Sequence, residues 1–266
     1  MASPAFRFGS LAALALLLSF LAIPLVAIFV EAGPGELLAS LGTDGAKEAL
    51  LLSLQTSLAA LVLVVAVGTP AAYLLARRRF RGRAAVITLI ELPLVLPPAA
   101  AGIALLAAFG PEGLVGGALE ATGLRLVLET AGVVVAMAFV AAPFYVRGAI
   151  AAFEAVDPGL IDASRTLGGS EARTFARIAL PGARAGLASG LALAWGRALG
   201  EFGATLLFAG SLQGRTQTAP LAIFEFLSRD FDASLALSGV LVVFSAVLLL
   251  GVKLLGGAPE VARAQS

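Results

Sequence analysis

The chain has 266 residues, of which 59% are hydrophobic and 13% are charged, and its formal net charge is +1. A soluble domain of this length needs more polar surface, so the composition indicates an integral membrane protein. The near-neutral charge argues against a nucleic-acid partner, and the absence of Cys and His argues against disulfides, nucleophile pairs and soft metal sites.

Six apolar segments follow one another along the chain, at about 11–30, 50–76, 84–109, 126–146, 186–208 and 235–255. Each has roughly 20 residues or more, which at about 1.5 Å per residue crosses a hydrocarbon core of about 30 Å. The backbone has no water to bond there, so helices are expected. The sequence therefore predicts an all-α integral membrane protein, with six transmembrane helices in a single domain over 1–266. Segment 11–30 is alternatively a cleaved signal peptide, but its apolar core exceeds the usual roughly 7–15 residues, which favours a retained helix.

The basic residues predict the orientation of these spans, because Lys and Arg concentrate on the cytoplasmic side. With the N-terminus inside, 13 of the 18 Lys and Arg residues face the cytoplasm. Both termini and a loop at about 150–184 are then cytoplasmic. The inner set is Arg7, Arg77, Arg78, Arg79, Arg81, Arg83, Arg147, Arg165, Arg173, Arg177, Arg184, Lys253 and Arg263. The outer set is Lys47, Arg125, Arg215 and Arg229, and Arg197 lies within a span.

The third segment contains several residues that disturb a membrane helix: Glu91, Pro93, Pro97, Pro98 and Gly102. Proline removes a backbone hydrogen bond and clashes with the preceding turn, so this span should be bent or broken. Broken helices often line a transport path, because the freed carbonyls need water or neighbours. A kinked helix with a purely structural role is the alternative.

Residues 157–181, which we call the polar hairpin, lie between two apolar segments and read as two short helices. Asp157, followed by proline, is a strong helix start, and Gly168 and the glycine after it should end this helix. Ser170 can cap a second helix, and we expect Pro181 to close this helix and to open the next segment. One face of the first helix is apolar or small, comprising Leu160, Ala163, Ser164 and Leu167. In the second helix, Ala172, Phe175, Ala176 and Ala179 share a side.

Within the polar hairpin, Asp162, Ala163, Ser164, Gly168, Ile178, Leu180 and Pro181 resemble the EAA-x3-G-x9-I-x-LP signature of ABC importer permeases. The spacing agrees at every fixed position, although Asp162 replaces glutamate and Ser164 replaces the second alanine. The resemblance implies a coupling hairpin that docks on an ABC ATPase subunit. The implied coupling residues are Leu160, Asp162, Ala163, Ser164, Leu167, Gly168, Phe175, Ile178, Leu180 and Pro181. An ordinary surface loop is the alternative.

The fifth segment carries WGRALGEFGATLLFAG at 195–210, with one cation and one anion. Gly196, Gly200 and Gly203 should allow close helix packing. Arg197 and Glu201 are four residues apart and should form an ion pair, which could also reach Glu91. The alternative is that Arg197 attracts anions in a translocation pathway and Glu201 holds it in place. The candidate pathway residues are Glu91, Arg197, Glu201 and Thr205.

Together with GRTQTAPLAIF at 214–224, this segment resembles the molybdate permease group of the ABC importers. Phe224 stands where the group commonly has tyrosine, and residues 211–213 also depart from its pattern. The resemblance implies a permease subunit for a tetrahedral oxyanion, with molybdate first and tungstate, sulfate or thiosulfate as alternatives. We expect a multi-pass protein of a bacterial or archaeal cytoplasmic membrane, surrounded by lipid.

The implied partners are a second copy of this chain, two ABC ATPase subunits, and a periplasmic or lipid-anchored oxyanion-binding protein. No G-x-x-x-x-G-K-[ST] motif occurs, so ATP and Mg²⁺ would be used by the ATPase, and this chain would be neither an enzyme nor a cofactor-binding protein. An ion-coupled secondary transporter is the rival class, supported by Glu91, Glu129 and Glu201 as intramembrane carboxylates. That class does not account for the cytoplasmic hairpin, and the inverted sequence repeat that many secondary transporters have is not apparent here. A membrane scaffold that transports nothing is a third class.

Overall fold

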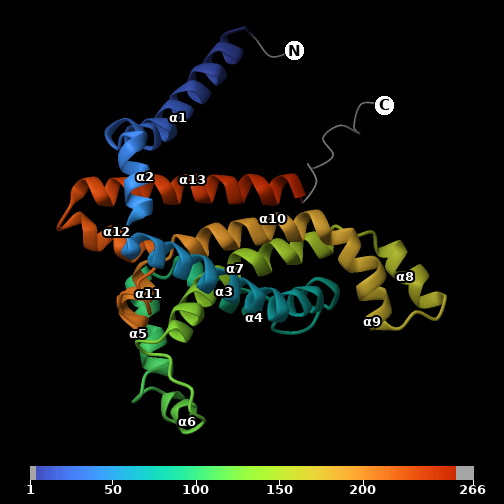
Figure 1. Cartoon of the computed structure of the whole chain (residues 1–266). Coiled ribbons are helices and arrows are strands. Elements are labelled where there is room, and N and C mark those ends of the chain that lie inside the picture. The colour runs from blue at the N-terminus through green and yellow to red at the C-terminus, as the bar shows by residue number, and fades with distance from the viewer. Residues whose placement is uncertain (1–3, 256–266) are drawn as a thin grey trace.

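The computed structural model describes residues 4–255, and this part of the chain contains helices but no strand. Arg263, which the orientation count used, lies outside the described residues. In chain order the elements are α1 (Pro4–Glu31), α2 (Pro34–Gly42), α3 (Asp44–Arg77), α4 (Arg83–Val95), α5 (Pro98–Phe109), α6 (Gly116–Ala121), α7 (Thr130–Glu154), α8 (Pro158–Thr166), α9 (Glu171–Thr174), the π-helical turn η1 (Phe175–Ala179), α10 (Leu180–Leu199), α11 (Gly203–Ala209), α12 (Ala219–Leu227) and α13 (Phe231–Leu255). Figure 1 shows them in sequence colours.

Four helices are long and apolar enough to cross a membrane, covering Phe6–Glu31, Asp44–Arg77, Thr130–Glu154 and Phe231–Gly251. They correspond to the first, second, fourth and sixth predicted segments. The helix pair α4 and α5 adds a fifth candidate span if it is counted as one bent span. The described residues thus contain four or five candidate spans by length and composition.

The third and fifth predicted segments are each divided into two helices. The third breaks at Leu96 and Pro97, where the chain bends by 118° between α4 and α5. This confirms the expectation of a bent or broken helix, since Pro97 cannot continue the hydrogen-bond ladder of α4. In the fifth segment, α10 ends at Leu199 and α11 begins at Gly203.

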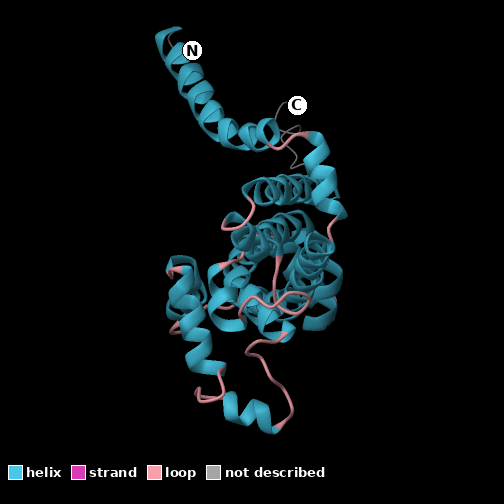
Figure 2. Ribbon diagram, turned by 60° about the vertical axis from the view of Figure 1, so that its left-hand side comes forward, coloured by secondary structure: helices cyan, strands magenta, loops and turns pink. Residues whose placement is uncertain are grey.

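Helix α7 is the centre of the bundle, and α3 and α10 pack along it (Figure 1). The side of α3 that is buried carries mostly small residues at helical spacing: Ala46, Ala49, Ser53, Ser57, Ala60, Val64, Gly68, Ala72 and Leu75. Small side chains let two backbones approach in a membrane, where dispersion contacts replace the hydrophobic effect. By contrast, α1 projects from the bundle in Figure 1 and in Figure 2, and its main contacts are with α13.

Glycines mark the closest helix approaches, but partly at other positions than predicted. A Cβ at Gly148 would lie 3.1 Å from the Cα of Gly190, where α7 crosses α10. A Cβ at Gly203 would lie 2.6 Å from the Pro98 Cβ, so the predicted close approach there is confirmed. The expectation for Gly196 is wrong within this chain, because a Cβ there would meet nothing within 4 Å. Gly200 ends α10. The sequence pattern identified small residues but not the side of α10 that faces α7.

Buried hydroxyls connect α3 to distant segments. Ser53 Oγ accepts a hydrogen bond from the backbone N–H of Ala219 at 2.7 Å, and Ser57 Oγ accepts one from Trp195 Nε1 at 3.1 Å. The Ala219 N–H belongs to the first turn of α12, where no helical carbonyl is available to it. Ser53 therefore ties the start of α12 to α3.

We expect Ser53→Ala to lower stability by about 1 kcal/mol, because the buried Ala219 N–H would lose its acceptor. The measurement is the thermal unfolding midpoint of the detergent-solubilised protein. Gln55→Ala, at an exposed position on the same helix, is the control. Equal midpoints for the two variants would contradict this role for Ser53.

Candidate functional site

The polar hairpin connects α7 to α10 and projects from one end of the bundle (Figure 1). Its first helix begins as predicted, with the Asp157 side chain accepting a hydrogen bond from the Gly159 N–H at 2.8 Å and proline at the first helical position. The second helix begins at Glu171, and Ser170 Oγ accepts from the Arg173 N–H at 3.4 Å. The two predicted caps are confirmed.

Two glycines form the turn between the helices, each for a different reason. Gly168 has φ +80°, a left-handed conformation that costs other L-residues about 1–2 kcal/mol. A Cβ at Gly169 would lie 2.6 Å from Ser164 Oγ, so this position must be small. The Gly169 N–H donates to the Ser164 carbonyl at 2.8 Å and closes the turn.

Pro181 opens α10 as predicted, but it does not close the helix before it, so that part of the prediction is wrong. The chain continues from α9 through η1 directly into α10, and Pro181 lies in the first turn of α10. The Leu180 N–H donates to the Phe175 carbonyl, which is an i to i+5 bond. This wider turn gives the proline ring room beside the preceding backbone, because a regular α-turn would press the ring against a carbonyl. The hairpin is therefore a continuous extension of α10.

Two buried contacts that the sequence did not predict hold the hairpin together. Ile161 is 2% exposed and belongs to the main apolar core, together with Val156 and Ala179. Thr174 is fully buried, and its hydroxyl lies 2.8 Å from Ser164 Oγ. Ser164, which departs from the signature alanine, thus joins the two helices.

The apolar residues predicted for docking differ in their surroundings. Leu160 is 55% exposed and Leu167 is 87% exposed, so they lie on the outer surface of the hairpin. The Phe175 ring packs inside, with its centroid 4.9 Å from that of Tyr73 and 6.0 Å from that of Phe153. Phe175 therefore anchors the hairpin to α3 and α7, while the two leucines are available to a partner.

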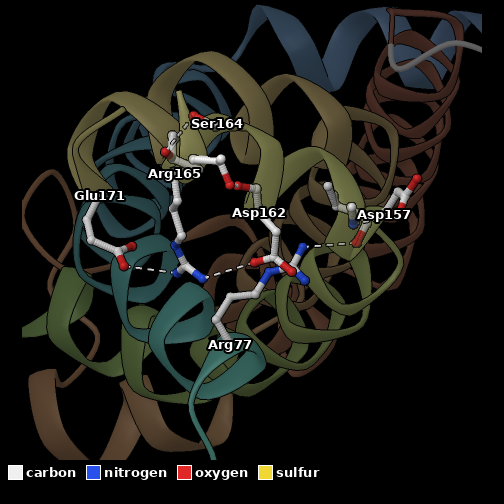
Figure 3. A network of polar contacts seen from close by, with 10 residues as sticks. Arg77, Asp157, Asp162, Ser164, Arg165 and Glu171 are labelled. Atoms are coloured by element: carbon white, nitrogen blue, oxygen red, sulfur yellow. Dashed lines mark hydrogen bonds and ion pairs between the residues drawn. The ribbon is translucent and has the colours of Figure 1, made fainter. Parts of the chain in front are cut away.

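Charged side chains brace the hairpin and its base (Figure 3). Arg165 lies between two carboxylates, with one nitrogen 2.9 Å from Glu171 and another 3.5 Å from Asp162. Arg77 donates to the Val156 carbonyl at 3.1 Å, which links the end of α3 to the segment before α8. Asp162 thus helps to orient Arg165 while most of its own side chain stays exposed.

The remaining signature residues lie along the continuous helix or on the outside. Ala163 and Pro181 are exposed, Ile178 is half-buried, and Leu180 is 36% exposed. The signature is therefore a mixture of residues that shape the hairpin and residues that remain accessible on it.

A second polar group lies at the break between α10 and α11. Arg197 and Glu201 form the predicted ion pair at 2.7 Å, with the Glu201 side chain 1% exposed and the Arg197 side chain 28% exposed. The other Glu201 oxygen accepts from the Ala204 N–H at 2.7 Å and caps α11. Thr205 is fully buried nearby. In this chain Glu201 and Thr205 are enclosed, and Arg197 reaches the surface.

Glu91 does not join this group, contrary to the expectation. It lies 3.6 Å from Arg147, between α4 and α7. The sequence places Arg147 on the cytoplasmic side of a span that ends at about 146, but in the structure Arg147 lies inside α7, which continues to Glu154. Glu129 precedes α7 and pairs with Arg215. Each of the three carboxylates that supported an ion-coupled transporter therefore has an arginine partner, which argues against that class.

The geometry is that of a helical bundle with broken spans and one projecting hairpin. The family described as "binding-protein-dependent transport system inner membrane component" matches residues 68–257. The chain belongs to this family. The match includes the polar hairpin and both broken spans.

Similar proteins agree with this assignment. The chain is 45% identical over 233 residues to the "Molybdenum transport system permease protein ModB" of Mycobacterium tuberculosis, covering 88% of each protein. It is 32% identical over 241 residues to the "Sulfate transport system permease protein CysW" of Synechocystis sp., covering 89% of this chain and 87% of that one. The chain also aligns with a chain of a bacterial alginate ABC transporter, which was solved in complex with an alginate pentasaccharide-bound periplasmic protein. The TM-score is 0.73 at 18% sequence identity, and the alignment covers 95% of this chain and 92% of that chain. This likeness supports the fold alone.

Proposed function

We propose that this chain is the membrane-spanning permease subunit of an ATP-driven importer for a tetrahedral oxyanion, and that the oxyanion is molybdate. The observation that carries the proposal is the 45% identity to a molybdenum permease across 88% of both chains. A sulfate permease, the second candidate, is more distant at 32% identity. Family membership and the projecting hairpin support the same class of transporter.

In this proposal the chain forms one membrane domain with six spans, counting α4–α5 and α10–α11 as one span each. Both termini and the polar hairpin face the cytoplasm. Two copies enclose the pathway, two ATPase subunits use ATP and Mg²⁺, and a binding protein delivers the oxyanion from outside. Selectivity then belongs to the binding protein, because a tetrahedral dianion is selected by convergent donors in a closed site.

Transport follows from two arrangements of the same helices. The hairpin on each copy occupies a groove of an ATPase, with Leu160 and Leu167 as apolar contacts and Asp162 as the exposed charge. ATP-driven closure of the ATPase pair moves the hairpins together. Because each hairpin continues into α10, this motion reaches the break at Glu201 directly. ATP hydrolysis resets the arrangement, so differential contacts in the two states couple ATP to transport.

The test is uptake into vesicles that contain this chain, its ATPase and its binding protein, with molybdate, tungstate and sulfate compared. We expect ATP-dependent molybdate uptake that requires all three components, and titration of the binding protein should give the same order of anions. Preference for sulfate would replace the proposed substrate. Uptake by this chain alone, or the absence of any ATPase when the chain is purified from its native membrane, would overturn the whole proposal.

A further inference from the structure

One charged pair, Glu91 and Arg147 between α4 and α7, has no role in the hairpin or in the break of α10. Arg147 precedes the end of α7 by two helical turns, and Glu91 follows the start of α4 by a little more than two turns. At about 1.5 Å per residue, each lies roughly 10 Å from the end of its helix. Both side chains are therefore within the span that α4 and α7 provide.

The Glu91–Arg147 pair is loose in comparison with the other ion pairs of these helices. Its atoms are 3.6 Å apart, longer than a hydrogen bond, and the Arg147 side chain is 71% exposed. At the end of α7, Arg83 and Glu154 are 2.7 Å apart, and the Arg83 side chain is 29% exposed. Most of the Arg147 guanidinium thus remains open to a further partner.

An exposed arginine at this depth constrains what faces α4 and α7. Charged side chains in a membrane are costly against hydrocarbon and turn toward a water-filled space or another protein segment. The surface that carries Glu91 and Arg147 should therefore border water rather than lipid. In a permease made of two copies, that water belongs to the translocation pathway.

We propose that Arg147 is a transient contact site for the tetrahedral oxyanion in the inner part of the pathway, and that Glu91 keeps the contact weak. This inference rests on the proposed function. A guanidinium can donate two parallel hydrogen bonds to two oxygens of such an anion. The nearby carboxylate repels the anion, and a site for passage must release its ion as readily as it accepts it.

The chain contains no cysteine, so single cysteines can report on water and charge at this surface. Val95 is 79% exposed and lies one helical turn beyond Glu91 on the same side of α4. Leu89 is 66% exposed and lies on the opposite side of that helix. In the complete transporter, we expect Val95→Cys to react with small anionic and cationic methanethiosulfonates, and Leu89→Cys with neither. Adding Arg147→Gln should lower the ratio of anionic to cationic labelling rates about tenfold.

Uptake separates an anion contact from a brace between two helices. We expect Arg147→Gln to lower the maximal molybdate uptake rate about tenfold and Arg147→Lys to retain part of it. Glu91→Gln breaks the same pair but keeps the guanidinium and removes the repelling charge. It should therefore lower the uptake rate less than Arg147→Gln does, and it should raise the ratio of anionic to cationic labelling at Val95→Cys. Any of three results would overturn the inference: equal losses of uptake in Arg147→Gln and Glu91→Gln, no reaction of Val95→Cys with either reagent, or a labelling ratio that Arg147→Gln leaves unchanged. If the cysteine-free parent imports molybdate with ATP in these experiments, the proposed function stands regardless; if the parent fails to import, the proposed function itself is wrong.

Discussion

Replacing Gly168 with valine should abolish molybdate uptake and transport-linked ATP hydrolysis while the protein still inserts in the membrane. Gly168 has φ +80°, and a β-branched residue there is strained by at least the about 1–2 kcal/mol that a left-handed conformation costs. The turn can relieve this strain only by changing the angle between α8 and α9. That change would displace Leu160 and Leu167 from any surface that fits them in the native turn.

The measurements are vesicle uptake and binding-protein-stimulated ATPase activity of the complete transporter. Gly123→Val is the matched control, since Gly123 has φ +84° and, like Gly168, has nothing within 4 Å of an added Cβ. It carries similar backbone strain in the loop before α7, far from the hairpin. Unchanged uptake in Gly168→Val, or an equal loss in Gly123→Val, would remove the hairpin turn from the coupling mechanism.

The hairpin shows which parts of a site follow from local sequence. The caps at Asp157 and Ser170 and the turn at Gly168 depend on bonds within a few residues, so the residue types alone predicted them. The burial of Ile161 and the contact between Ser164 and Thr174 depend on how the hairpin lies against the bundle. A nine-residue helix gives too short a pattern to separate Leu160 from its neighbour Ile161.

The charged residues of the spans show the same division. The spacing of Arg197 and Glu201 predicted their pairing because both lie on one face of one helix. The partner of Glu91 depends on which helix lies beside α4, so the sequence suggested only the Arg197–Glu201 pair and missed Arg147. Similarly, Pro97 predicted the break in the third span, but not the bend of 118° or the packing of α5 against α11. The prediction that Pro181 closes the second helix of the hairpin is wrong because a π-turn lets the helix continue past a proline.

The Arg197–Glu201 pair should give a large and asymmetric effect on stability. In Arg197→Gln, a carboxylate with 1% of its side chain exposed loses its counter-charge. In Glu201→Gln, the remaining arginine has 28% of its side chain exposed and can reach polar surroundings. The amide oxygen of glutamine can also still accept the Ala204 N–H, so the cap of α11 persists. We therefore expect Arg197→Gln to be the more damaging of the two variants.

The expected cost of Arg197→Gln approaches the about 3–5 kcal/mol of breaking a buried ion pair. The double variant Arg197→Gln with Glu201→Gln should recover most of that loss, because no charge remains buried. The measurement is the thermal midpoint and the monodisperse yield of detergent-solubilised protein, analysed as a double-mutant cycle. Glu225→Gln, in a more exposed pair with Arg229, is the control and should change stability by about 1 kcal/mol or less. Additive losses in the double variant would show that the two side chains are not coupled and would contradict this prediction.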